Sequence, residues 1–121
     1  MDIYAENILE HYKDPHNHGT IENADVTQTA ANPLCGDHLV LYITVDNGTL
    51  SAVKFAGRGC AISQASASML TDELIGMKIA EAKAITADDV LEMLGVEIGP
   101  TRMKCALLIL DALTEALQKI S

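Results

Sequence analysis

The sequence contains no tryptophan, one phenylalanine and only three cysteines among its 121 residues. Hydrophobic residues still make up 49% of the chain, so the core must be filled by Leu, Ile, Val, Met and Ala. The odd number of cysteines argues against a disulfide framework and leaves either free thiols or a metal site. The length predicts a single domain over residues 1–121.

Basic residues are also scarce. Eight Lys and Arg stand against 17 Asp and Glu, which gives a net charge of −9. Such a surface repels phosphate backbones, so we expect no nucleic-acid partner, and a basic partner protein suits this charge better. No run is long and apolar enough to span a membrane, and no signal peptide opens the sequence. We therefore expect a soluble, cytoplasmic protein without a membrane partner.

The most informative stretch is residues 57–63, which read GRGCAIS. It follows a β-like run and opens a run of small residues, which places Cys60 at a strand-to-helix turn. There the unpaired N–H groups and the positive end of the helix dipole lower a thiol pKa and favour the thiolate. The alternative is a buried structural cysteine after a tight turn, which is common for a lone cysteine.

Periodicity and capping signals predict the other elements. Asp2 is a candidate cap for a helix that ends at residues 13–15, and Thr86 is a candidate cap for a helix that ends at Gly95. We expect a short edge strand over 26–31, a hairpin with strands 38–45 and 50–56, and further helices over 61–75, 79–83 and 100–119.

Two registers are possible for the hairpin. A two-residue turn at Asn47 and Gly48 would put Lys54 opposite Leu41, on the apolar face. A three-residue loop instead pairs Leu41 with Val53 and Leu39 with Phe55, and it places Lys54 beside Val40. We predict the second register because the hydrophobic pattern fixes register. It also sets Asp37 opposite Gly57 and brings Cys35 close to Cys60.

Four polar residues are the candidates for a shared site: Cys35, Asp37, Cys60 and Cys105. Three thiolates and a carboxylate suit a tetrahedral zinc ion, and three thiolates also suit iron–sulfur chemistry. The sequence lacks a CxxC pair, so the spacing equally allows three separate core thiols.

Histidines are weaker candidates for ligands. Alternation along the strand turns His38 to the opposite face from Asp37. His11, His16 and His18 do not predict a metal site, because two of them lie in an expected loop and no regular spacing joins them to a cysteine.

At this point the sequence resembles a known family, the U-type iron–sulfur cluster assembly scaffolds, which include NifU-like, IscU-like and SufU-like domains. Residues 32–37 (NPLCGD), residues 57–63 and the Lys104-Cys105 pair are similar to the three cysteine motifs of that family. Residues 4–12 (YAENILEHY), followed by Asp14-Pro15 and Gly19, are similar to its amino-terminal helix and turn. The resemblance covers nearly the whole chain.

The resemblance implies an α+β fold in which a three-stranded antiparallel sheet packs against several helices. It also implies that Cys35, Asp37, Cys60 and Cys105 line one exposed site. The family takes sulfur from a cysteine desulfurase, assembles a labile [2Fe–2S] cluster there for apo iron–sulfur proteins, or holds zinc in the same site. On this basis we expect a scaffold rather than an enzyme.

Two branches of the family remain as interpretations. Residues 59–69 and Lys104 resemble the SUF-type branch, whose members are zinc-dependent sulfur acceptors with sulfurtransferase activity. The short stretch between Cys60 and Cys105 resembles the scaffold branch, which we favour. Residues 99–103 do not reproduce the proline-rich segment that a specialised Hsp70 chaperone recognises, so we do not expect that partner.

The sulfur acceptor is predicted from local setting. Cys105 lies near the start of a helix, after the Gly99-Pro100 break, where fraying costs least, and Lys104 can stabilise its thiolate or persulfide. In the SUF-like interpretation Cys35 is the better acceptor, and the remaining alternative is that Cys105 serves only as a ligand.

Overall fold

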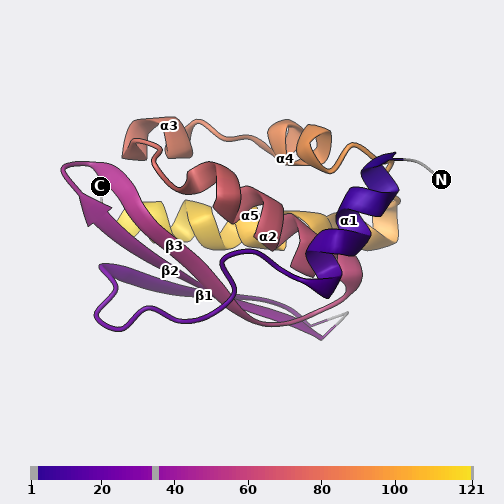
Figure 1. The fold of residues 1–121 in the computed structure, drawn as a ribbon, viewed down its shortest axis with the longest axis horizontal. Coiled ribbons are helices and arrows are strands. Elements are labelled where there is room, and N and C mark those ends of the chain that lie inside the picture. Colours follow the sequence, from indigo (N-terminus) through magenta and orange to yellow (C-terminus); the bar gives the residue numbers. More distant parts are fainter. Residues whose placement is uncertain (1–2, 34–35, 121) are drawn as a thin grey trace.

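The computed structural model of the protein describes residues 3–33 and 36–120. In these ranges the predicted α+β fold is confirmed: three strands form one antiparallel sheet in the order β1-β2-β3, with helices packed on it (Figure 1). Every predicted helix and strand is present to within two residues, while the expected cap Asp2 lies outside the described residues. The elements are α1 Ile3–Lys13, β1 Val26–Asn32, β2 Asp37–Asp46, β3 Thr49–Arg58, α2 Ala61–Leu74, α3 Ile79–Lys83, α4 Ala87–Leu94 and α5 Pro100–Ile120.

The elements are arranged in layers. Helices α2 and α5 cover one face of the sheet, and α3 and α4 lie on the far side of these helices (Figure 1). The core lies between the sheet and the two helices, where Leu39, Leu41 and Phe55 meet Ile109 and Leu113, each at most 1% exposed. This packing fixes the strand ends relative to the starts of α2 and α5.

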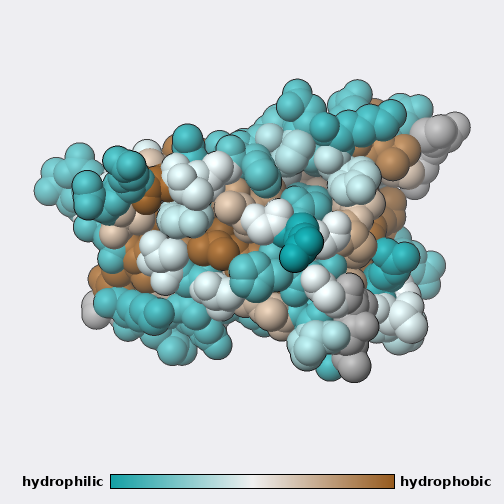
Figure 2. Space-filling view, turned by 90° about the horizontal axis from the view of Figure 1, so that it is seen from below, coloured by the Kyte–Doolittle hydropathy of each residue, from teal (hydrophilic) through white to brown (hydrophobic). Residues whose placement is uncertain are grey.

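The outer face of the sheet is polar. Thr27, His38 and Lys54 are exposed there, as alternation along the strands requires. Figure 2, seen from below, shows a mainly hydrophilic surface with hydrophobic residues in separated patches. None of the described helices is long and apolar enough to cross a membrane.

The hairpin register differs from the prediction. Leu41 pairs with Phe55 and Ile43 with Val53, so the expected pairs Leu41–Val53 and Leu39–Phe55 are wrong. Lys54 consequently lies opposite Tyr42 and not beside Val40. The faces were nevertheless predicted correctly, because the true register differs from the predicted one by an even number of residues.

A bulge explains this outcome. Asn47 and Gly48 form a two-residue turn with positive φ values of 53° and 76°. Next to the turn the strands therefore pair in the register that, if continued, would put Lys54 opposite Leu41 on the apolar face. The register then shifts between Thr44 and Val45, where Ser51 is the extra residue on β3. The bulge returns the apolar side chains to the core without a longer loop.

The new register moves Asp37 along the sheet. Leu39 pairs with Gly57 and His38 with Arg58, so Asp37 lies beyond the end of β3, next to the turn that contains Cys60, and not opposite Gly57. The pairing of β2 and β3 therefore places Asp37 next to the start of α2.

Backbone groups from elsewhere cover the outer edge of β3. The loop after α1 runs beside the strand: Gly19 donates its N–H to the Phe55 carbonyl at 2.8 Å, and Phe55 donates to the Asn17 carbonyl at 3.0 Å. These hydrogen bonds use backbone groups of the edge strand that would otherwise be available to a strand of another chain. It also fixes the loop that carries His16 close to α2.

The buried side of the first half of α5 carries Cys105. The line through Cys105, Ile109, Ala112 and Ala116 is buried, whereas Met103, Leu107 and Leu110 are only half-buried. Cys105 therefore points into the molecule.

We expect Gly57→Ala to destabilise the fold severely. Gly57 has a φ of 115°, and a Cβ there would overlap the carbonyl oxygen of His38 on the paired strand. Strain and overlap together should lower the free energy of unfolding by about 3 kcal/mol or more. Urea unfolding of zinc-free protein measures this. Gly48→Ala is the matched control: it has a positive φ but open space around it, so about 1 kcal/mol is expected. Equal losses in the two variants would contradict the packing argument.

Candidate metal centre at the start of helix α2

Asp37 is a buried carboxylate with one satisfied oxygen. It is the first residue of β2, pairs with Asn32 at the end of β1, and is 2% exposed. Its Oδ1 accepts a hydrogen bond from the backbone N–H of Cys60 at 3.0 Å. Its Oδ2 is buried and has no hydrogen-bond partner among the described residues. A buried oxygen of this kind is costly unless an ion or a donor satisfies it.

The turn between β3 and α2 holds Cys60 against this carboxylate. Cys60 is the N-cap residue of α2, with extended backbone at φ −72° and ψ 172°. A Cβ on Gly59 would overlap Ser63 Oγ and would lie 2.7 Å from Asp37 Oδ1, so a larger residue would displace these two side chains. Ser63 Oγ in turn donates to the Cys60 carbonyl at 3.0 Å. The turn therefore depends on a residue without a side chain.

The start of α2 lowers the pKa of the Cys60 thiol. Burial by itself raises this pKa, but a hydrogen bond from the backbone N–H of Ser63, and then the contacts with Cys105, the Ile62 N–H and the Ser63 side chain, bring it below its ordinary value. The direction agrees with the expectation for a cysteine at a strand-to-helix turn. The lowered pKa favours the thiolate form of Cys60, which is the form that binds metal.

Cys105 completes a cluster of three groups. It lies in the second turn of α5, and its Sγ is 4.0 Å from the Asn32 Nδ2. Asp37, Cys60 and Cys105 each offer one ligand atom, and these atoms all lie within 4.8 Å of one another. The fold therefore brings together three of the four residues singled out from the sequence. The fourth, Cys35, lies outside the described residues.

The resemblance implied one exposed site, but Cys105 is buried in it. The residue is 1% exposed, because the side of α5 that carries it faces the core. Cys60 is the more exposed of the two described cysteines. The Cys105 side of the site is therefore recessed.

Two neighbours of the site point elsewhere. His38 is exposed on the outer face of the sheet, as alternation predicted, so it does not compete with Asp37. Lys104 is exposed and, with Asn32 and Asp111, lines a hollow of about 270 Å³ beside the site. Lys104 therefore places a positive charge beside this hollow.

The sequence did not reveal the polar residues that support the site. Asn32, 5% exposed, contacts the Cys105 sulfur, and Ser63, fully buried, braces the Cys60 turn. In the sequence, Asn32 and Ser63 stood out only as members of the two cysteine motifs, without a role of their own. A second group consists of His11, His16 and Asp72. The two histidines were considered from the sequence and set aside as ligands, and Asp72 was not singled out.

The donor atoms fit a metal ion. Two sulfurs and a carboxylate oxygen are ligands that tetrahedral zinc accepts, and thiolates are the usual ligands of iron–sulfur clusters. An ion would also satisfy Asp37 Oδ2, which has no hydrogen-bond partner among the described residues.

Comparisons with known proteins agree with this geometry. The chain is 39% identical over 115 residues to iron-sulfur cluster assembly scaffold protein IscU 1 of Archaeoglobus fulgidus, covering 95% of this chain and 74% of that protein. It is 34% identical over 134 residues to the zinc-dependent sulfurtransferase SufU of Bacillus subtilis, covering 97% and 90%.

A solved structure is also similar. The crystal structure of a putative iron-sulfur cluster assembly scaffold protein for the SUF system from Fervidobacterium islandicum AW-1 matches with a TM-score of 0.80 and 33% identity. The match covers 93% of this chain and 94% of that one. The NifU-like N terminal domain profile matches residues 3–121. The chain is thus similar both to scaffold proteins and to a sulfurtransferase, and it belongs to the NifU-like N-terminal domain family.

Proposed function

We propose that this protein is an iron–sulfur cluster assembly scaffold, which accepts sulfur from a cysteine desulfurase and assembles a transient [2Fe–2S] cluster for transfer to apo-proteins. The observation that carries the proposal is the buried, unsatisfied Oδ2 of Asp37 in a cluster with two cysteines from distant segments. A purely structural role leaves this oxygen without an explanation. The relationship to the archaeal scaffold protein supports the same function.

Each residue has a distinct part in this proposal. Cys60 and Cys105 supply thiolates, and Cys35 supplies a third on the strength of the sequence motif. Asp37 supplies the carboxylate, which binds iron less firmly than a thiolate does. Because its other oxygen is held by the Cys60 N–H, Asp37 keeps its orientation when the cluster is absent. The weak fourth ligand makes the cluster transferable.

A second candidate function is zinc-dependent sulfur transfer. The observation in its favour is the mixed sulfur and oxygen donor set at a buried position, which suits a tetrahedral zinc ion. The relationship to SufU supports it. In this case Asp37, Cys60, Cys105 and Cys35 hold zinc, and the protein accelerates the desulfurase by removing its persulfide sulfur.

The expected partners follow from the charge and the reaction. A net charge of −9 favours docking to a desulfurase through a basic surface. The exposed Lys104 adds a local positive charge where an anionic persulfide would approach the site. Apo iron–sulfur proteins are the acceptors of the finished cluster.

Anaerobic reconstitution tests the proposal. The purified protein is incubated with ferrous iron, cysteine and a cysteine desulfurase, followed by absorption spectroscopy and transfer to an apo-ferredoxin. We expect a coloured protein that passes its cluster on, and loss of cluster formation in Cys60→Ser. His38→Asn is the matched control, since His38 adjoins Asp37 but is exposed on the outer face. A colourless protein that retains zinc and accelerates desulfurase turnover would replace the first function by the second.

We also propose that Cys105 is the sulfur acceptor, gated by the start of α5. The Cys105 thiolate attacks the terminal sulfur of the desulfurase persulfide, the S–S bond of the donor breaks, and the desulfurase departs as a thiolate. Because Cys105 is 1% exposed, the first turn of α5 must open for this attack. Helix ends open at the lowest free energy, which makes the step accessible.

Mass spectrometry after incubation with desulfurase and cysteine, without iron, checks this assignment. We expect the added sulfur to disappear in Cys105→Ser. Pro100→Gly, which loosens the first turn of α5, should increase the rate of sulfur uptake several-fold, while Pro15→Gly in the loop after α1 should not. Sulfur that persists in Cys105→Ser and is lost in Cys35→Ser would contradict the assignment and favour the alternative acceptor.

A further inference from the structure

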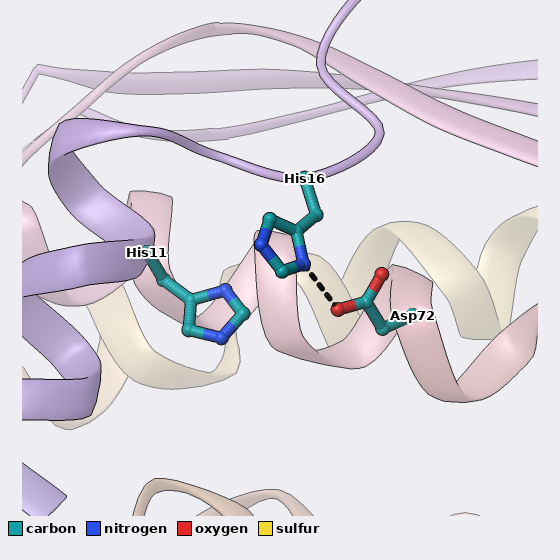
Figure 3. A group of neighbouring side chains, drawn as sticks. All are labelled: His11, His16 and Asp72. Carbon is teal, nitrogen blue, oxygen red and sulfur yellow. Dashed lines mark hydrogen bonds and ion pairs between the residues drawn. The ribbon is translucent and has the colours of Figure 1, made fainter.

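A second group of ligand-type side chains lies at the other end of α2. His11 comes from the last turn of α1, His16 from the loop that follows, and Asp72 from the last turn of α2 (Figure 3). Each offers one ligand atom, and these atoms all lie within 4.8 Å of one another. The two imidazole rings are 4.5 Å apart between centroids and tilted by 50°.

We propose that His11, His16 and Asp72 form a second metal site, which binds a divalent transition metal such as Zn²⁺. It does so independently of the first site, the thiolate site formed by Asp37, Cys60 and Cys105. Two imidazoles and one carboxylate are a ligand set that zinc and ferrous iron both accept. Three protein ligands leave an open position on a tetrahedral ion. The absence of a thiolate sets this site apart from the one around Cys60.

Hydrogen bonds orient the carboxylate. Asp72 Oδ2 is 2.6 Å from His16 Nδ1, while Asp72 Oδ1 accepts from Asn17 Nδ2 at 2.8 Å. Asn17 Nδ2 also donates to Thr71 Oγ1 at 3.0 Å, which ties the loop to α2. One carboxylate oxygen is therefore held by the protein and the other faces the histidines, as in metal sites whose ligands are braced by neighbours.

Ser68 plays the same role for the histidines. Its Oγ lies 2.7 Å from His11 Nδ1 and accepts the backbone N–H of His16 at 2.7 Å. In the tautomer of His11 that donates Nδ1–H to Ser68, Nε2 carries the lone pair that an ion needs. His11 is 9% exposed and thus fixed by packing, whereas the side chains of His16 and Asp72 are 54% and 43% exposed.

The geometry requires only side-chain adjustment. Ligand atoms bound to one zinc at about 2.0 Å lie about 3.3 Å apart in a tetrahedron. The His16–Asp72 pair must therefore open slightly from 2.6 Å, and the remaining separations must close from at most 4.8 Å. The exposed side chains of His16 and Asp72 have the freedom to do so.

The two sites are spatially separate. Cys60 caps the beginning of α2 and Asp72 lies in its last turn, so at about 1.5 Å per residue they are about 18 Å apart along the helix axis. An ion at the second site would connect α1, the following loop and α2. It would stabilise the packing of α1 without touching the cluster ligands.

Zinc titration of the untagged, metal-free protein tests the proposal. We expect two equivalents of zinc per chain in the unmodified protein, by calorimetry and by metal analysis after gel filtration. His16→Gln and Asp72→Asn should each bind one equivalent. The matched controls His18→Gln and Asp14→Asn change an exposed histidine and an exposed carboxylate of the same loop, and should retain two. A single equivalent in the unmodified protein, or two in both site variants, would overturn the proposal in favour of a plain His16–Asp72 ion pair.

A second measurement on the unmodified chain removes any dependence on the folding of the variants. Zinc added beyond one equivalent should shift the imidazole NMR signals of His11 and His16, while those of His18 and His38 stay in place. Unchanged His11 and His16 signals would equally overturn the proposal.

Discussion

The hydrogen bond from the Cys60 N–H to Asp37 Oδ1 is the interaction on which the thiolate site depends. It joins the first residue of β2 to the residue that begins α2, and a charged acceptor makes it stronger than an ordinary backbone bond. Because of this bond, the two oxygens of the Asp37 carboxylate have different roles. Oδ1 completes the start of the helix, and Oδ2 stays buried without a partner among the described residues, available to an ion.

Helix α2 organises the neighbouring elements through buried serines. Ser63 Oγ donates to the Cys60 carbonyl, Ser66 Oγ donates to the Ala106 carbonyl at 2.7 Å, and Ser68 Oγ contacts His11 and His16. All three serines are fully buried. Their small size lets α5 and α1 approach closely, and the hydroxyls of Ser66 and Ser68 contact polar groups on these neighbouring segments. The run of small residues thus links the thiolate site, the core and the histidine group.

Much of the fold could be predicted because its signals are local. The capping box at Thr86, the left-handed Gly95 and the alternation of Leu39, Leu41 and Ile43 each depend on a few adjacent residues. The hairpin register could not be predicted, because two arrangements place the same apolar side chains on the core face. One is a two-residue turn followed by the bulge at Ser51, and the other is a longer loop without a bulge. The pattern fixes the face, and the turn and bulge together decide the pairing.

The candidate sites show the same limit. The cysteine motifs singled out Asp37, Cys60 and Cys105, but the burial of Cys105 depends on how α5 is rotated against the sheet. The grouping of His11, His16 and Asp72 depends on α1 packing against the end of α2, and these residues are far apart in the sequence. Contacts between residues so far apart in the sequence leave no local sequence pattern, so only the structure reveals them.

A crystal structure of the zinc-loaded protein tests the central claim most directly. The account predicts Asp37 Oδ2 bound to the ion at about 2.0–2.2 Å, with the sulfurs of Cys60 and Cys105 at about 2.3 Å. It also predicts that the Cys60 N–H still donates to Oδ1, as it does without an ion. An ion bound by the cysteines with the Asp37 carboxylate turned away from it would contradict the account.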